Sequence, residues 1–319
     1  MALLELVLHV VRPKESIGVS WKRSDPYLLF RRDREGDWRQ TVFTLLAEHL
    51  RGQGVAVRTE DREAFGVRKV GLPGPAVTIR DSLAVLQNDR TGSYWVLDCH
   101  DWTRTDDIRP FRWDLRCRGM LKCQYRSSDI SGFRTRIVRP WTYFDANWPR
   151  QQDAQIQLRN CSRSVAQLYF RGQLWEERKT IVLILQNRKV LNPDATAISH
   201  KEFLRELASQ RLALSLPGFG DFCHRDVEAF AVGTPVLRPK VRNQFHCELK
   251  ADFHYVSVNT DIAKDSAAVV AARIEERYRE VIGQTDYLAE VARNAAAWYD
   301  RNVRFPQSMV LTAKLLGFA

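Results

Sequence analysis

Apolar residues recur along the chain at two spacings, one typical of strands and one typical of helices. Arg39–Arg51 carries an apolar stripe at helical spacing, and strands are predicted on either side of it, at Pro26–Arg32 and Val55–Arg58. Because this strand–helix–strand order favours a parallel sheet, the first half is predicted to be Rossmann-like. Residues 59–75, rich in charge, Gly and Pro, are predicted to form a surface loop, and Ser82–Gln87 a short helix or turn.

The second half of the chain carries clearer helix signals. Helical spacing predicts helices at Glu176–Asn187 and His200–Ser209, and longer ones at Ser266–Ile282 and Tyr287–Arg301. A polar stretch, residues 145–163, lacks periodic apolar positions and is interpreted as the boundary between the halves. A chain of 319 residues also exceeds one ordinary core, because a domain holds about 150 residues. We therefore expect two α/β domains.

Composition limits the partners more than it limits the fold. The formal net charge is +11, largely from arginine, whose planar fork suits phosphates and carboxylates. An anionic partner is therefore expected, and a nucleotide sugar, a lipid-linked phosphate, an anionic membrane face and nucleic acid all fit. The six cysteines include no CxxC pair and no zinc spacing with histidine, so reduced thiols without a metal are expected. No apolar run is long enough to span a bilayer and no signal peptide is recognised, so we expect cytoplasmic residence.

The stretch Arg211–Pro239 carries the densest set of structural signals. A buried strand, Leu212–Leu216, runs into a turn with two glycines, and helical spacing resumes at Arg225–Val232. A glycine turn that feeds a helix directs backbone N–H groups and the positive end of the helix dipole into one small volume, which suits a phosphate. His224 and Glu228 lie on one side of the predicted helix start. In the alternative interpretation, this is an ordinary strand-to-helix connection with a solvated ion pair.

Two motifs in the second half match a known pattern. Residues 225–236, RDVEAFAVGTPV, place an arginine, a Glu-Ala pair and Gly-x-Pro-Val at fixed spacing after the glycine turn. Upstream, residues 169–178, YFRGQLWEER, place an aromatic-Phe-x-Gly strand end before a second arginine. Together the motifs resemble the nucleotide-sugar site of GT-B glycosyltransferases, especially exostosin-like and related families.

This resemblance implies a fold, an activity and a set of donor-site residues. The fold would be α/β and GT-B-like, with two Rossmann-like domains across a cleft: residues 1–155 for the acceptor, residues 156–304 for the nucleotide sugar, and residues 305–319 returning to the first domain. The activity would be that of a hexosyltransferase-type glycosyltransferase in glycan biosynthesis, with no metal or other cofactor, because arginines and backbone N–H groups neutralise the diphosphate. The implied donor-binding residues are Arg171, Gly172, Arg178, Gly218, Phe219, Gly220, His224, Arg225 and Glu228.

A polar cluster ends the apolar strand predicted within Tyr94–Trp102. Asp98, His100 and Asp101 follow this strand, where ligands bind in open α/β sheets. His100 or Asp101 is therefore the candidate catalytic base that accepts the proton of an acceptor hydroxyl. In one alternative, the two carboxylates only hydrogen-bond their own turn. In another, Asp98 and Asp101 bind a metal in a GT-A-like glycosyltransferase.

The expected partners follow from the same interpretation. The co-substrate is a nucleoside diphosphate sugar, and the acceptor is a glycan, a lipid-linked molecule or a small molecule. Peripheral association with the anionic inner membrane is a further expectation. Nucleic acid is the less favoured partner: a basic α/β nucleic-acid-binding protein would gather its arginines on one continuous face. The sequence selects neither the sugar, nor the nucleotide base, nor the stereochemical outcome.

Overall fold

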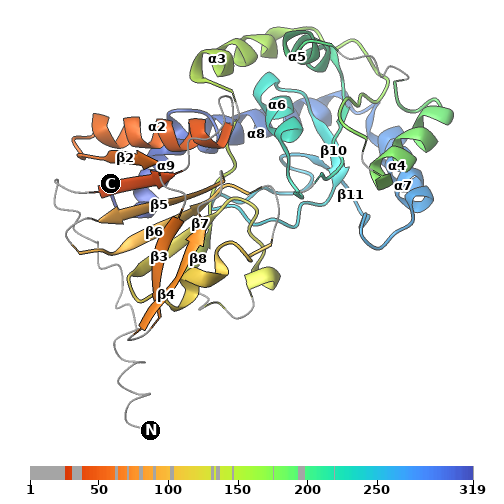
Figure 1. Ribbon diagram of the computed structural model, residues 1–319. Coiled ribbons are helices and arrows are strands. Elements are labelled where there is room, and N and C mark those ends of the chain that lie inside the picture. Colours follow the sequence, from red (N-terminus) through yellow and green to blue (C-terminus); the bar gives the residue numbers. More distant parts are fainter. Residues whose placement is uncertain are drawn as a thin grey trace.

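The computed structural model shows a mixed α/β chain that forms two units (Figure 1). It describes residues 26–30, 38–61, 64–69, 72–78, 82–88, 91–100, 104–130, 133, 137–145, 147–174, 176–192, 198–218 and 220–318. Within these ranges, no helix combines the length and the apolar character needed to cross a bilayer. The expected α/β class is confirmed, with a six-stranded, a three-stranded and a two-stranded sheet among the described residues.

The first unit is built on a six-stranded sheet with the order β2-β1-β5-β6-β7-β8. β1 and β2 are parallel, and so are β6, β7 and β8, whereas β5 runs antiparallel to its neighbours β1 and β6. The predicted parallel sheet is therefore interrupted by one antiparallel strand. The strands are β1 (Pro26–Phe30), β2 (Arg58–Asp61), β5 (Leu83–Asn88), β6 (Tyr94–Asp98), β7 (Cys117–Lys122) and β8 (Val138–Pro140).

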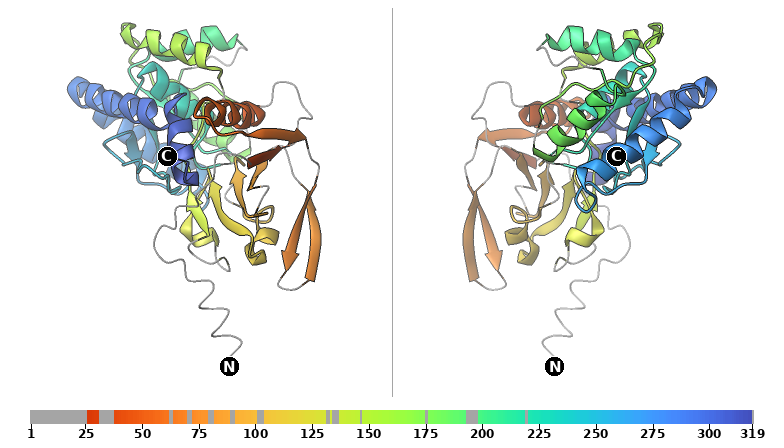
Figure 2. Two further views of the ribbon diagram at one scale, coloured as in Figure 1. Left: turned by 90° about the vertical axis from the view of Figure 1, so that its left-hand side faces the viewer. Right: turned by 90° about the vertical axis from the view of Figure 1, so that its right-hand side faces the viewer.

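Two segments of the first unit differ from the sequence-based expectation. The stretch predicted as a surface loop contains a hairpin of two antiparallel strands, β3 (Ala64–Lys69) and β4 (Leu72–Thr78), which projects from the body of the unit in both views of Figure 2. The stretch predicted as a short helix or turn contains β5. Tertiary contacts explain both errors: the ring of Phe65 in β3 packs edge-on against Tyr94 at 4.8 Å between centroids, and β5 is hydrogen-bonded on both sides.

A pair of helices covers one face of the first sheet. α2 (Trp38–Gly52) follows β1, and the last helix, α9 (Gln307–Leu316), packs against it (Figure 1). Successive side chains of a strand point to opposite faces of the sheet. Ala84, Leu86 and Leu97 therefore pack in the same core as these two helices, and the alternate residues of β5 and β6 pack in the core on the other face. Three residues of the C-terminal helix complete this core: Met309, Ala313 and Leu316.

The second unit has a three-stranded parallel sheet with helices on both faces. The order is β11-β10-β9, from β9 (Ala213–Leu214), β10 (Val236–Pro239) and β11 (Val256–Val258). Apolar residues of α4 and α7 lie in the core on one face, and those of α5 and α6 lie in the core on the other. The helices are α3 (Pro149–Gln157), α4 (Glu176–Asn187), α5 (His200–Ser209), α6 (His224–Val232), α7 (Ala267–Val281) and α8 (Thr285–Asn302), and a short 3-10 helix spans Leu158–Asn160. Two further 3-10 helices, Arg109–Trp113 and Ser127–Ile130, connect strands of the first unit.

The two units meet at the carboxyl ends of their parallel strands. Tyr125, just after β7, bridges to Gln244, which follows β10. The N–H of His246 donates to the carbonyl of Trp141, after β8, at 3.0 Å. Loops that follow strands in both units therefore face each other, which is where ligands bind in open α/β sheets.

Candidate functional site

The strand–turn–helix stretch predicted from the sequence is present at this junction. Leu212–Leu216 is buried throughout, and α6 follows the glycine turn. The helix begins after Cys223, whose N–H donates to the Asp226 carboxylate at 2.9 Å. It ends at Gly233, whose φ of 75° lies in the left-handed region that favours glycine. Local sequence signals thus determine both ends of the helix.

The glycine turn is closed by a hydrogen bond of its own. The N–H of Gly218 donates to the carbonyl of Gly220 at 3.0 Å. Donation from Gly218 to a phosphate, as predicted, would therefore require this bond to be exchanged. Phe219 lies outside the described residues. The N–H groups at the start of α6 point out of the helix end, as at any helix N-terminus, and are the backbone donors that face the turn.

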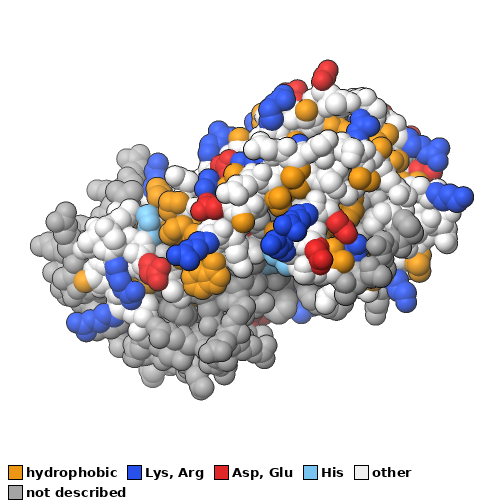
Figure 3. All heavy atoms as spheres, turned by 90° about the horizontal axis from the view of Figure 1, so that it is seen from above, with side chains coloured by type: hydrophobic (Ala, Val, Ile, Leu, Met, Phe, Trp, Pro, Cys, Tyr) orange, Lys and Arg blue, Asp and Glu red, His pale blue; other side chains and the backbone are white. Residues whose placement is uncertain are grey.

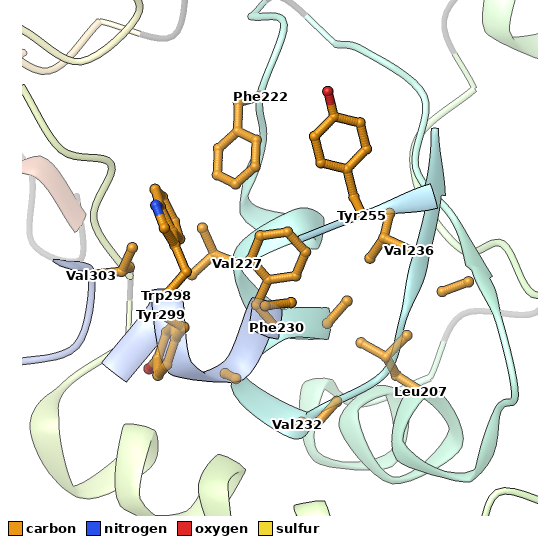
Figure 4. Packing of buried hydrophobic residues seen from close by; sticks show 14 of the residues in the cluster. Leu207, Phe222, Val227, Phe230, Val232, Val236, Tyr255, Trp298, Tyr299 and Val303 are labelled. Carbon is orange, nitrogen blue, oxygen red and sulfur yellow. The ribbon is translucent and has the colours of Figure 1, made fainter. Parts of the chain in front are cut away.

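Phe222 anchors the loop between the turn and α6. Its ring lies edge-on to Tyr143 at 5.3 Å and to Phe245 at 5.2 Å. Figure 4 shows Phe222 directed toward Phe230 of α6 and Trp298 of α8, and the centroids of Phe222 and Trp298 are 6.1 Å apart. This aromatic packing spans both units, because Tyr143 follows β8. It holds the loop in place before any ligand binds.

Beneath the turn, a fully buried ion pair joins β10 to α6. A guanidinium nitrogen of Arg238 lies 2.5 Å from the Asp226 carboxylate, and neither side chain is exposed. Although burial lowers it, the pKa of Arg238 is raised by Asp226 and Asp221. Arg238 also donates to the carbonyl of Asp221. The pair therefore connects the helix start, the loop and the strand end.

Two guanidinium groups converge beside the turn. Arg178 of α4 donates to the carbonyl of Leu216 at 2.7 Å and to that of Gln173 at 3.0 Å. Arg225 of α6 donates to the carbonyl of Arg171 at 2.6 Å. Burial, and then the nearby charge of Arg225, lower the pKa of Arg178.

Both guanidinium groups lack a carboxylate partner. Among the described residues, no carboxylate lies within ion-pair distance of Arg178 or Arg225, and each has one buried nitrogen without a hydrogen-bond acceptor. The two guanidinium groups are held close together by hydrogen bonds to uncharged backbone carbonyls, so their positive charges are not neutralised at the turn. This arrangement is complementary to an anion with several oxygens.

Two glycines make this convergence possible. A Cβ at Gly172 would lie 1.7 Å from a terminal nitrogen of Arg225, and one at Gly218 would lie 3.0 Å from a terminal nitrogen of Arg178. Any side chain at Gly172 would displace the guanidinium. Gly172, predicted from the sequence as a donor-site residue, thus contributes by leaving room for the guanidinium of Arg225 rather than by contacting a ligand.

Arg171, predicted to bind the diphosphate, has its guanidinium directed elsewhere. It pairs with Glu206 of α5, with 2.7 Å between Nε and Oε2, and the hydroxyl of Tyr169 donates to the same oxygen at 3.0 Å. The hydrogen bond to Glu206 raises the pKa of Arg171. In this structure Arg171 serves the site through its carbonyl, which holds Arg225.

Glu228 does not form the solvated pair with Arg225 considered above. Its Oε1 lies 2.7 Å from Nε2 of His200, at the start of α5. This hydrogen bond raises the pKa of His200. The Oε2 atom makes no hydrogen bond within the described residues. The ring of His224 packs against Tyr143 with 5.3 Å between centroids, so His224 lies where the two units meet.

Across the junction, Asp98 is the centre of a buried polar network. Its Oδ2 accepts from Nζ of Lys122 at 2.7 Å, and its Oδ1 accepts from the N–H of His100 at 2.9 Å and lies 3.1 Å from the Nδ1 atom of that residue. Burial raises the pKa of Asp98, but Lys122 and His100 outweigh it and lower the value to about 2. Nε2 of His100 lies 2.5 Å from the hydroxyl of Ser82. His100 is therefore an oriented but buried imidazole, and Asp101 lies outside the described residues.

The metal alternative fits this network poorly. Both oxygens of Asp98 already accept hydrogen bonds, one of them from a lysine ammonium. Among the described residues, no group of three or more His, Cys, Asp or Glu side chains is arranged to hold a metal ion. Asp98 thus behaves as the partner of Lys122 rather than as a metal ligand.

Several residues that the sequence analysis missed join the two sides. Gln124 donates to the carbonyl of Phe222 at 2.7 Å and accepts from Asn243. Arg126 donates to Asn243 at 3.1 Å and lies 3.6 Å from the carboxylate of Asp221. Each follows a strand or the glycine turn, and that position was the only signal available in the sequence. They fix the turn against the first unit.

The fold and the turn define a two-unit α/β protein in which Arg178 and Arg225, both without a carboxylate partner among the described residues, converge beside the glycine turn. No protein-family model and no curated protein matches the chain. Among solved structures it is similar to a glycosyltransferase from Rickettsia africae, at 10% identity and a TM-score of 0.43, over 85% of this chain and 78% of that one. It is also similar to HepE from Anabaena, solved with UDP and glucose, at 13% identity and a TM-score of 0.43, over 67% and 66% of the chains. A third is the pneumococcal O-GlcNAc transferase GtfA, solved with UDP and GlcNAc, at 8% identity and a TM-score of 0.35, over 80% and 69%.

Proposed function

We propose that the protein is a glycosyltransferase that transfers a sugar from a nucleoside diphosphate sugar to a hydroxyl acceptor. The observation that carries this proposal is the convergence of Arg178 and Arg225 at the glycine turn without a carboxylate partner. A diphosphate supplies the negative charge and the several acceptor oxygens that such a pair lacks. The start of α6 adds backbone donors and a helix dipole of the same sign.

The reaction breaks the bond between the sugar's anomeric carbon and a diphosphate oxygen, and forms a bond from that carbon to the acceptor oxygen. The diphosphate leaves with the electron pair, so negative charge grows on it in the transition state. Arg178 and Arg225, held in place before binding, would stabilise this charge at little reorganisation cost. Glu228 would accept a hydrogen bond from a ribose or sugar hydroxyl through its Oε2 atom.

The acceptor side of the proposal rests on the first unit. The acceptor proton would pass to His100 or Asp101 at the end of β6. For His100 this requires Nε2 to exchange the hydroxyl of Ser82, 2.5 Å away, for the acceptor hydroxyl. We also propose, from the sequence motifs, kinship with exostosin-like families and a glycan, lipid-linked or small-molecule acceptor, and, from the net charge of +11, peripheral association with an anionic membrane.

Nucleic-acid binding is less well supported by the surface. On the face seen in Figure 3, Lys and Arg side chains lie in separate groups, interspersed with acidic and apolar side chains. Several arginines are also paired with carboxylates, for example Arg188 with Glu275 and Arg273 with Asp265, both at 2.8 Å. A continuous basic face is the feature that nucleic-acid binding would need.

Calorimetric titration with UDP, GDP, ADP, CMP and dTDP, each with and without a chelator, tests the proposal. We expect one diphosphate to bind selectively, with an affinity that the chelator does not change. Arg225→Gln removes a charge-assisted contact worth about 1.5–3 kcal/mol, so Kd should rise about 10–150-fold. Glu228→Gln tests the sugar-hydroxyl contact, with a larger effect on the nucleotide sugar than on the nucleotide.

The matched control is Arg279→Gln, which removes an equal charge from a side chain that pairs with Glu275 on the surface of α7. Circular dichroism of each variant establishes that it is folded. Unchanged nucleotide affinity in folded Arg225→Gln, or no binding of any diphosphate by the parent protein, would refute the donor site.

A further inference from the structure

A second basic site lies at the opposite end of α6 from the glycine turn. A cavity of 380 Å³ opens there, within the range of about 300–1,000 Å³ usual for ligand pockets. Since α6 spans 9 residues, the two ends are about 14 Å apart at 1.5 Å per residue. We call this cavity the arginine-rimmed pocket; its lining comprises Arg159, Arg163, Arg211, Gly233, Pro235, Thr285, Leu288, Ala289, Ala292, Arg293 and Ala296.

One wall of the arginine-rimmed pocket is apolar and smooth. Ala289, Ala292 and Ala296 recur at spacings of three and four residues along α8, so they share one face of the helix. Their small side chains, together with buried Leu288 and Pro235 at the start of β10, leave room for an apolar group. Removing such an apolar surface from water is favourable, so the apolar part of a ligand would bind against it.

The rim of the pocket is cationic. Arg159 is already neutralised, because it forms a two-pronged ion pair with Asp300, at 2.7 and 2.9 Å, and donates to the carbonyl of Ala231. The other three arginines, here called the rim arginines, have no carboxylate within ion-pair distance among the described residues. They are Arg163, Arg211 and Arg293.

The rim arginines retain unused donors. Arg163 donates through Nη2 to the carbonyl of Val232, the last residue of α6, at 3.2 Å and to that of Arg159 at 3.4 Å, while its buried Nε has no hydrogen-bond partner among the described residues. Arg211 donates to the hydroxyl of Thr285 at 3.1 Å. The guanidinium of Arg293 makes no hydrogen bond to another described residue. An anionic head group would find three guanidinium forks beside an apolar wall.

We propose that the arginine-rimmed pocket binds a small amphipathic anion, with a phosphate or carboxylate head against the rim arginines and an apolar body against α8. The site is separate from the proposed donor site and does not depend on it. The ligand can be a free metabolite or the exposed end of a membrane lipid, because both present the same head-group chemistry.

Octyl phosphate is the probe, measured by calorimetry on the full chain at fixed salt. We expect it to bind more tightly than inorganic phosphate or octanol, since each of these lacks one half of the ligand. The variant Arg211→Gln/Arg293→Gln should weaken octyl phosphate at least about tenfold, because two charge-assisted contacts are lost. Ala289→Phe, at an exposed position of the wall, should also weaken it while leaving every charge in place.

The matched control is Arg301→Gln, eight residues further along α8 and outside the pocket lining. It should leave octyl phosphate binding unchanged. Vesicles of phosphatidylcholine with and without phosphatidic acid separate the two ligand sources: binding that needs both phosphatidic acid and the rim arginines indicates a membrane lipid, and binding of soluble octyl phosphate alone indicates a metabolite.

Three results would overturn the proposal: equal binding of inorganic phosphate and octyl phosphate, no effect of Ala289→Phe, or equal losses in the control and the double variant. Nucleotide affinity should be the same in the parent and the double variant. If no nucleotide binds at all, the donor site fails, and octyl phosphate still reports on this pocket.

Discussion

The buried pair of Asp226 and Arg238 gives a quantitative test of how the glycine turn is held. Asp226→Asn removes the negative charge but keeps an oxygen that can accept from the N–H of Cys223, which the carboxylate does at 2.9 Å. The variant therefore isolates the ion pair from the helix cap. Because neither side chain is exposed, solvent cannot replace the partner that Arg238 loses, and its remaining carboxylate neighbour, Asp221, lies at the longer distance of 3.9 Å.

The expected loss follows from this burial. Removing one partner of a buried pair costs about 3–5 kcal/mol. A chain of 319 residues unfolds with an entropy of about 0.7 kcal/mol/K, so the melting temperature should fall by about 4–7 °C. Arg238→Met should cost a similar amount, whereas Asp226→Asn/Arg238→Met should recover much of the loss, since no unpaired charge remains.

Differential scanning calorimetry and urea unfolding measure these changes. Asp300→Asn is the control, because its partner Arg159 is partly exposed, and such pairs contribute about 0–1 kcal/mol. The reasoning is refuted if Asp226→Asn shifts the melting temperature no more than this control does, or if the double variant loses as much as the two single variants together.

Three further predictions concern individual side chains. The hydrogen bond to Glu228 should give His200 a pKa above 6.5 by NMR titration; the stabilisation is present below pH 6.5 and lost as pH rises through the raised value, and Glu228→Gln should return the pKa to its ordinary range. The ion pair with Lys122 stabilises the fold above pH 3.8, the ordinary pKa of Asp98, and this stabilisation is lost as pH falls toward 2. Lys122→Met removes the largest cause that lowers the pKa of Asp98, so the variant should be less stable at neutral pH and should lose less stability between pH 3.8 and pH 2, as measured by urea unfolding followed by circular dichroism. A maleimide should label Cys161 first in the native protein, because Cys161 is exposed while the other cysteines are buried or half-buried, and Cys161→Ser should abolish the fast phase.

The elements with local signals were predictable from the sequence. The bounds of α5 match the expected helix, because Ser199 accepts from the N–H of Glu202 at 3.3 Å and forms a capping box with it. Its apolar residues also recur at helical spacing. The hairpin of β3 and β4 escaped prediction, since its stability comes from Phe65 packing against Tyr94 across a gap of many residues.

The residues of the candidate site also fall into those that the sequence could predict and those that depend on contacts between distant segments. The resemblance to GT-B donor sites assigned Arg178 and Arg225 to one site at the glycine turn, and the structure brings them together. No local pattern could assign Arg171 to Glu206 or Glu228 to His200, because those partners come from another helix. Long-range pairing decides which polar side chains remain available to a ligand.

The position of α9 has a consequence for synthesis on the ribosome. Met309, Ala313 and Leu316 belong to the core that also contains Phe43 and Leu97. That core therefore closes only after α9 has been translated, although α2 emerges early. During translation at about 5–20 residues per second, the first sheet waits with this face covered by α2 alone while the second unit is made. A chaperone that shields this face, or a stop codon just before α9, would thus decide whether the early half reaches its native state.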